Sequence, residues 1–297
     1  MKLQYWLLLI VAQTIWASSY VAMKISLGAM PYSMVIFLRY GTVALFFLGS
    51  WFITGFPRFT PKIVWGSLLI GFLNFYGSQF LQLHGLEKTQ AIDVSILILF
   101  EPMLTVLMAY FILQERITKN LWIVLAISML GFFVISDIHF QDRVLMWSKA
   151  RVWGNLLFLS ALIFEASCTV FGKVFTEENN AFNAMGLLMF FGGVGALLIH
   201  FPTVISFDYA SISMRAWGAL MFLAFGCSIF AYTAWYFAIS KVRVQFVALS
   251  LFLQPIVGSL VGFLVLGEEL SPRTFVGALI ISIGLLWWQA RRKAVLG

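Results

Sequence analysis

The chain has 297 residues, of which 62% are hydrophobic and 10% are charged, and its mean hydropathy is +0.96. Because a soluble protein carries about a quarter charged residues, this composition excludes a soluble globular protein and predicts a polytopic α-helical membrane protein. The net charge of +7 does not indicate a nucleic-acid partner, since Lys and Arg lie mainly in the loops and at the C-terminus, where membrane topology accounts for them.

Apolar blocks of about 20 residues, the length that crosses a bilayer, recur along the chain. They predict ten transmembrane helices, at residues 3–24, 32–54, 63–83, 91–113, 119–136, 152–174, 183–204, 215–238, 245–266 and 273–290. The first block is too long for a cleavable signal, so we expect it to remain as a helix. Lys and Arg number eleven on the side of the termini and seven on the opposite side, which favours cytoplasmic N- and C-termini.

The two halves of the chain form an internal repeat. Adding 153 carries Pro102 to Pro255, Glu115 to Glu268 and Gly131 to Gly284. We therefore expect a first five-helix repeat at residues 1–136, a connecting loop at 137–151 and a second five-helix repeat at 152–297. An odd number of spans in each half inverts the second repeat in the membrane, an architecture typical of alternating-access carriers with a site near the midplane.

The stretch Ser95–Thr118 holds the most unusual residues of the first half. We expect one apolar helix broken at its centre by Glu101 and Pro102, with the proline freeing the carbonyl of Ile98. Ionisable groups inside a span are costly and usually functional. Glu101 is a candidate to bind a substrate amine or a coupling proton, or to form a structural ion pair. Arg39, also in mid-membrane, needs a partner, and Glu101 and Glu165 are the candidates.

Polar and aromatic side chains recur at helical spacing on the first, third, sixth and eighth spans. Such stripes either line a shared cavity or hold helices together through hydrogen bonds, and four of them favour the cavity. The candidate substrate-binding residues are Trp16, Tyr20, Lys24, Arg39, Asn74, Tyr76, Ser78, Glu101, Glu165, Thr169, Tyr232, Trp235 and Gln254. Lys24 could receive an anion at one mouth of the pathway or simply anchor its helix at the interface. No cofactor motif, metal-ligand cluster or catalytic arrangement is evident.

The pattern of both halves resembles the EamA family of the drug/metabolite transporter superfamily. It consists of Trp16-Ala17-Ser18 through Lys24, Pro31 through Arg39, Glu101-Pro102 through Glu115-Arg116-Ile117-Thr118, Gly131, and a second copy at Pro255 through Glu268-Glu269-Leu270-Ser271. The resemblance covers nearly the whole chain. It implies ten helices, cytoplasmic termini, a bacterial inner membrane and export of metabolites.

The chain also looks similar to the YddG-type amino-acid exporters of that family. In their picture Trp16 is the cavity aromatic of the first span. Where that subgroup tends to place further aromatics on the fourth and sixth spans, this chain has Glu101 and Glu165. That departure favours a substrate with an amine or another cationic group.

We therefore expect a non-enzymatic exporter of amino acids or related small metabolites that works by alternating access, without a cofactor. Its partners are a small-molecule substrate and the lipid bilayer; a monomer is one option, and the sequence leaves the oligomeric state open. The alternative within transport is proton-coupled efflux of drugs or organic cations, with Glu101 as the titrating group. An integral membrane enzyme is disfavoured because the loops are short and poor in Asp, His and Arg.

Overall fold

The computed structural model describes residues 3–86, 88, 97–98, 100–135, 149–261, 263–264 and 272–296, and every element with assigned bounds in this part of the chain is helical. The first half consists of α1 (Leu3–Leu27), α2 (Tyr32–Thr54), α3 (Pro61–Phe72), the π-helix η1 (Leu73–Ser78), α4 (Gln79–Leu86), α6 (Phe100–Leu113) and α7 (Lys119–Ile135). The all-helical fold class is confirmed for these residues.

The second half starts with α8 (Lys149–Glu178) and α9 (Ala181–Ile205). The 3₁₀ turn η2 (Tyr209–Ser211) leads into one continuous run of α10 (Met214–Met221), the π-helix η3 (Phe222–Ala231) and α11 (Tyr232–Lys241). The chain continues with α12 (Val244–Leu249), the 3₁₀ turn η4 (Ser250–Phe252), α13 (Leu253–Val261) and α14 (Pro272–Leu296). These bounds lie within a few residues of the expected spans.

Five of the described helices are long and apolar enough to cross a membrane: Gln4–Leu27, Tyr32–Thr54, Lys149–Glu178, Ala181–Ile205 and Met214–Lys241. Shorter apolar helices cover Phe100–Leu113, Lys119–Val134, Val244–Gly258 and Pro272–Trp288. Ten complete spans therefore stay a prediction, because parts of the expected fourth and ninth spans lie outside the described residues.

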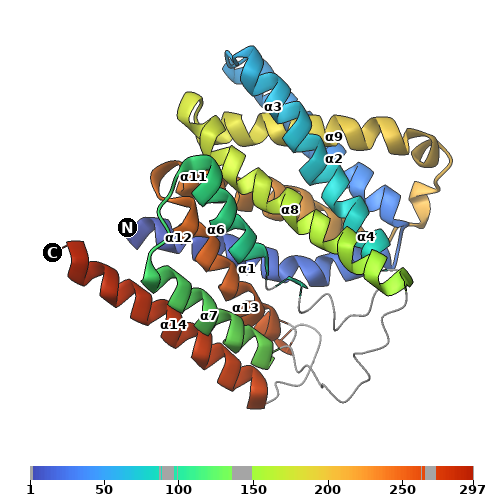
Figure 1. Ribbon diagram of the computed structural model, residues 1–297. Coiled ribbons are helices and arrows are strands. Elements are labelled where there is room, and N and C mark those ends of the chain that lie inside the picture. The colour runs from blue at the N-terminus through green and yellow to red at the C-terminus, as the bar shows by residue number, and fades with distance from the viewer. Residues whose placement is uncertain are drawn as a thin grey trace.

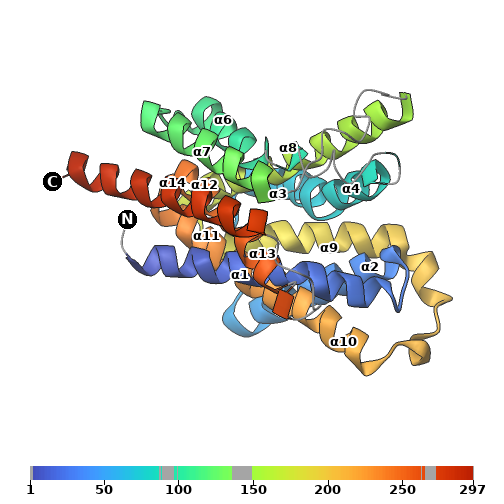
Figure 2. The same ribbon diagram turned by 90° about the horizontal axis from the view of Figure 1, so that it is seen from below.

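Helices from the two halves lie side by side throughout the bundle. α7 of the first half packs along α14 of the second, α2 and α3 pack on α9, and α6 and α4 pack on α8 (Figure 1). Figure 1 also shows both chain termini at the same end of the molecule. Seen from below, α6 and α7 lie on one side and α1, α2 and α10 on the other (Figure 2).

Glycines permit the closest of these contacts. A Cβ on Gly71 of α3 would collide with the backbone of Leu188 in α9, and one on Gly193 of α9 would collide with the carbonyl of Tyr40 in α2. Small residues of this kind let membrane helices approach closely. The close approach brings α2 and η1, which carry Arg39 and Asn74, against the second half of the chain.

The proline of the central stretch acts differently from our expectation. α6 begins at Phe100, so Pro102 lies in its first turn, where a missing N–H costs no helical hydrogen bond. The carbonyl of Ile98 is not free, because it accepts the N–H of Glu101 at 3.2 Å. Residues 91–96 and 99 lie outside the described part, as do Glu268, Glu269 and Ser271.

Candidate functional site

Two π-helical segments, η1 in the first half and η3 in the second, occupy corresponding places in the repeat. An offset of 150 aligns residues 72–80, FLNFYGSQF, with residues 222–230, FLAFGCSIF, and equates Ser78 with Ser228. The wider π turn lets the Ser228 hydroxyl donate to the carbonyl of Leu223, five residues back, at 3.0 Å. Such segments are rare and often mark functional positions.

Arg39 is buried in α2 and is held by the second half of the chain. It is 8% exposed, its Nε donates to Ser228 Oγ at 2.9 Å, and its guanidinium carbon lies 4.9 Å from the ring centre of Tyr40. No ion pair of Arg39 with Glu101 or Glu165 occurs among the described residues, so the expected partner is wrong. A hydroxyl and an aromatic face take that place, and no hydrogen bond of the terminal guanidinium N–H groups occurs among the described residues.

Glu165 of α8 is held in the same way, but by the first half. Its Oε1 accepts a hydrogen bond of 2.7 Å from Gln82 Nε2 of α4. Glu101 of α6 lies close enough for its charge to interact with that of Glu165. The hydroxyls of Thr105 and Thr169 donate to the carbonyls of Glu101 and Glu165, at 3.0 and 3.5 Å, and so bind their own helices. Two acidic side chains from different halves of the chain therefore influence each other electrostatically.

Tyr40 and Tyr232 are near enough to both Arg39 and Glu165 to be influenced by their charges. The charges of Arg39 and of Glu165 both act on the hydroxyl groups of both tyrosines. The ring of Phe75 lies 5.6 Å from that of Tyr40 and 5.3 Å from that of Tyr232. Tyr40 and Tyr232 are therefore the two tyrosines on which both the positive and the negative side chain act.

Trp16 supplies an aromatic wall from α1. Its ring centre lies 4.8 Å from that of Tyr232 and 5.2 Å from that of Trp235, both in edge-to-face geometry. Its Nε1 donates to the carbonyl of Cys227 in η3 at 3.0 Å. The structure thus brings the candidate aromatic residue of the first span against the two of the eighth span.

Gln254 is tied to a residue that was absent from our candidate set. Its Nε2 donates to Gln13 Oε1 at 2.8 Å, and Gln13 Nε2 donates to Ser250 Oγ at 3.0 Å. Gln13 is completely buried. The signal for it was present, because Gln13 belongs to the same helical stripe as Trp16, but a stripe does not say which member makes a contact.

The remaining candidates lie at different places relative to the interior cluster, by which we mean Trp16, Arg39, Tyr40, Glu101, Glu165, Tyr232 and Trp235. Ser78 donates to the carbonyl of Asn74 at 2.6 Å, and Asn74 Oδ1 is buried with no hydrogen bond in the described structure. Tyr76 is not among the cluster's described ring contacts, since it packs on Phe72, Phe80 and His200. The side chains of Tyr20 and Lys24 lie outside the described part. Among the described residues, no group of His, Cys, Asp and Glu could hold a metal ion.

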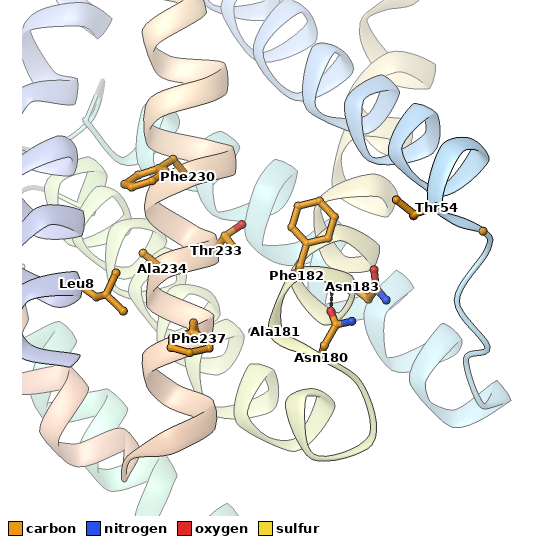
Figure 3. A pocket seen from close by; sticks show the side chains of 11 residues that line it. Leu8, Thr54, Asn180, Ala181, Phe182, Asn183, Phe230, Thr233, Ala234 and Phe237 are labelled. Atoms are coloured by element: carbon orange, nitrogen blue, oxygen red, sulfur yellow. Dashed lines mark hydrogen bonds between the residues drawn. The ribbon is translucent and has the colours of Figure 1, made fainter. Parts of the chain in front are cut away.

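A groove of about 740 Å³ lies apart from these residues, on another face of α11 (Figure 3). It is lined by Leu8, Thr54, Gly55, Asn180, Ala181, Phe182, Asn183, Phe230, Thr233, Ala234 and Phe237. Phe230 and Phe237 are 52% and 42% exposed, on the outer surface of the bundle. The groove contains none of the candidate residues, and its apolar walls suit hydrocarbon rather than a charged solute.

Comparison with known proteins gives the family and the fold. The model of the EamA-like transporter family matches residues 4–137 and 152–288. The chain is 24% identical over 286 residues to "Uncharacterized transporter YetK" of Bacillus subtilis (strain 168), covering 95% of this chain and 86% of that protein. It is 24% identical over 284 residues to a "Probable amino-acid metabolite efflux pump" of Escherichia coli (strain K12), covering 91% and 90%. A solved crystal structure matches with a TM-score of 0.78 at 17% identity, over 98% of this chain and 99% of that one.

Proposed function

The chain belongs to the EamA-like transporter family, and on that premise we propose that it exports amino acids or closely related zwitterionic metabolites by alternating access. The family membership makes it an integral membrane transporter. The substrate, the outward direction, the bacterial inner membrane and the cytoplasmic termini belong to the proposal, as do the two repeats at 1–136 and 152–297 that rock about the interior cluster.

One observation carries the choice of substrate. Arg39 and Glu165 are each anchored by a neutral side chain from the opposite half and do not pair with each other. In a medium of low dielectric constant, unpaired opposite charges attract complementary groups far more strongly than in water. An amino acid brings a carboxylate for Arg39 and an ammonium for Glu165 or Glu101, with Tyr40 and Tyr232 between them.

The aromatic wall fits the remainder of such a substrate. Trp16, Tyr232 and Trp235 offer apolar ring surface, and ligand sites usually combine such surface with a few oriented polar groups. A relative described as a probable amino-acid metabolite efflux pump supports the same class. Asn74 Oδ1, buried without a partner, adds a hydrogen-bond acceptor.

A second candidate is proton-coupled efflux of organic cations. The closeness of Glu101 to Glu165 favours it, because two acids and one Arg leave a net negative site when all three are ionised. An amino zwitterion does not change that balance, whereas a cation or a proton neutralises it. The two candidates differ in whether the substrate needs a carboxylate.

The test compares ligands that differ by one charged group. Thermal shift of the purified protein should respond to amino acids, and about tenfold more weakly to amino-acid amides, which lack the carboxylate, and to hydroxy acids, which lack the amine; a tenfold difference in Kd corresponds to about 1.4 kcal/mol. Equal responses to amino acids and amides would favour the organic-cation alternative.

A single variant tests the acidic end of the site. Glu101→Gln keeps the size of the side chain and removes its charge, so uptake of a confirmed zwitterion into proteoliposomes should fall about tenfold, the effect of losing roughly one charge-assisted contact. Unchanged uptake by Glu101→Gln would show that Glu101 does not contact the substrate. Uptake that continues after collapse of the pH gradient would show that transport is not coupled to protons.

A further inference from the structure

The short helix α12 begins without a cap from its own segment. Arg243, which precedes it, makes no side-chain hydrogen bond to its first turn. Glu115 supplies the cap from the first half of the chain: its two carboxylate oxygens accept the N–H of Val244 at 2.9 Å and of Gln245 at 3.2 Å. The Gln245 side chain donates back to the carbonyl of Glu115 at 3.0 Å.

The connection before α12 is held by a charge of the opposite sign. Lys173 of α8 donates to the carbonyls of Ile239 and Val242, at 2.7 and 3.3 Å, at the C-terminal end of α11. A cation at a helix C-terminus and an anion at a helix N-terminus are both favourable placements. Glu115 and Lys173 also attract each other, so the two-residue link between α11 and α12 lies between an anion and a cation.

Glu115 is oriented for this contact at a local conformational cost. The preceding residue, Gln114, has φ 56°, a left-handed conformation that residues other than glycine rarely adopt. Backbone strain of this kind persists where the surroundings impose it, often at functional positions. Burial raises the pKa of Glu115, and the N–H groups of Val244 and Gln245 with the nearby cations oppose that rise.

At its C-terminal end α12 is followed by a change in helix type. The 3₁₀ turn η4 (Ser250–Phe252) follows it directly, and a 3₁₀ stretch inside a longer helix often marks a hinge. Ser250 is held to α1 by the bond from Gln13 and donates to the carbonyl of Val247 at 2.7 Å. α12 is thus a six-residue helix with hydrogen bonds to Glu115 at one end and a 3₁₀ turn at the other.

α12 packs against the two helices that carry the acids, near the ends at which Glu115 and Lys173 lie. Val244, completely buried, packs between Ala109 of α6 and Val170 of α8, with Met108 beside them. α6 carries Glu101 seven residues before Met108, and α8 carries Glu165 eight residues before Lys173, so the two acids lie about 10–12 Å deeper along these helices. A solute that leaves the acids toward the termini therefore meets α12.

We propose that α12 is a gate at the end of the molecule that bears the termini, hinged at Ser250–Phe252 and latched closed by Glu115 and Lys173. The gate rests on the transport function proposed above and adds a residue-level mechanism of access. Because Glu115 belongs to the first half and α12 to the second, the latch joins the two halves and must open when they separate at this end.

The test measures access to a reporter beneath α12 and needs no substrate. Met108→Cys is introduced into the full chain in lipid nanodiscs, and its alkylation by a membrane-impermeant maleimide is timed. The parent chain, whose cysteines Cys168 and Cys227 are buried, sets the background. Lys241→Cys, at an exposed position, sets the maximum rate.

Glu115→Ala should raise the alkylation rate of Met108→Cys about tenfold or more, the shift expected when a charge-assisted hydrogen bond is lost. Lys173→Met should raise it as well. Glu177→Gln is the matched control, since it removes an exposed carboxylate beside Lys173 and should leave the rate unchanged. If Glu115→Ala does not give a monodisperse protein, Glu115→Gln and Gln245→Leu weaken the latch more gently.

An alkylation rate within about twofold of the parent in every folded latch variant would overturn the gate, because a latch that holds a two-state element must shift its population when removed. The outcome separates from that of the substrate proposal. If the alkylation rate rises in the latch variants but no amino acid stabilises the protein, the gate is supported and the proposed substrate is wrong. If amino acids bind but the alkylation rate does not change, the gate is wrong and the proposed substrate stands.

Discussion

The carboxylate of Glu165 accepts a 2.7 Å hydrogen bond from Gln82, and the two residues belong to opposite halves of the chain. The bond from Arg39 to Ser228 also crosses between the halves, at 2.9 Å. Each of these two charged side chains is therefore oriented by the half that does not carry it. Relative motion of the halves changes the support of both charges at once, which couples any rocking motion to the electrostatics of the interior.

Gln82→Met tests this support on the acidic side. The variant keeps the length of the side chain but cannot donate, so Glu165 loses the hydrogen bond from Gln82, and the affinity for a zwitterion should fall about tenfold, the usual effect of removing one partner of a charged group. Kd from thermal shift or calorimetry is the measurement. Gln79→Met, three residues earlier on the same helix, is the control, and a loss of equal size there would assign the effect to packing.

The repeat in the sequence anticipated part of this architecture. Gly131 and Gly284, related by the 153-residue offset, both lie at the contact of α7 with α14: a Cβ on Gly131 would press on Gly277 and Ile281, and one on Gly284 on Ile127. The two positions that the sequence relates therefore lie at one contact between the halves. Hydrophobic blocks and repeat positions are local or periodic properties, so they can be found in one sequence.

The partners of the polar residues could not be found in that way. Arg39 and Ser228 are 189 residues apart, and Gln13 and Gln254 are 241 apart. An apolar membrane segment offers several equivalent faces, and only the packed bundle decides which hydroxyl meets the guanidinium. The π-helices were missed for a related reason: residues 72–80 and 222–230 resemble each other, but nothing in their composition distinguishes a π turn from an α turn.

Variants at Ser228 and Arg39 distinguish the contributions of these two residues to substrate binding. Ser228→Ala removes the acceptor of the Nε bond and should weaken binding of a carboxylate substrate several-fold, about 1 kcal/mol. Arg39→Lys keeps the charge but loses the planar fork that matches a carboxylate, so we expect a larger loss, at least about tenfold. The affinity for amino-acid amides should change little in both variants. Equal losses for amides and acids would mean that Arg39 has a structural role.

The ring of Trp16 should contribute more to stability and to substrate affinity than its N–H group does. Trp16→Phe keeps an aromatic group near Tyr232 and Trp235 and loses only the bond to the Cys227 carbonyl, whereas Trp16→Ala also loses edge-to-face contacts worth about 0.5–1.5 kcal/mol per pair. We expect the melting temperature and the affinity to fall in the order wild type, Phe, Ala. The opposite order of Phe and Ala would mean that the ring blocks the substrate rather than contacting it.

The variant Gly193→Ala tests whether the packing of α2 on α9 affects both stability and the position of Arg39. The new methyl group would meet the carbonyl of Tyr40 and the side chain of Ala44, and overpacking of this kind costs about 1–3 kcal/mol. Gly218→Ala is the control, because a Cβ there meets nothing within 4 Å and alanine is favoured over glycine inside a helix by roughly 0.5–1 kcal/mol. The melting temperature should therefore fall for Gly193→Ala and stay the same or rise for Gly218→Ala.

The same variant should also change ligand selectivity. Since Tyr40 adjoins Arg39, a shift of α2 away from α9 also displaces the guanidinium, so Gly193→Ala should weaken binding of amino acids more than binding of their amides. A stable Gly193→Ala protein with unchanged selectivity would show that the Arg39 position does not depend on the contact between α2 and α9.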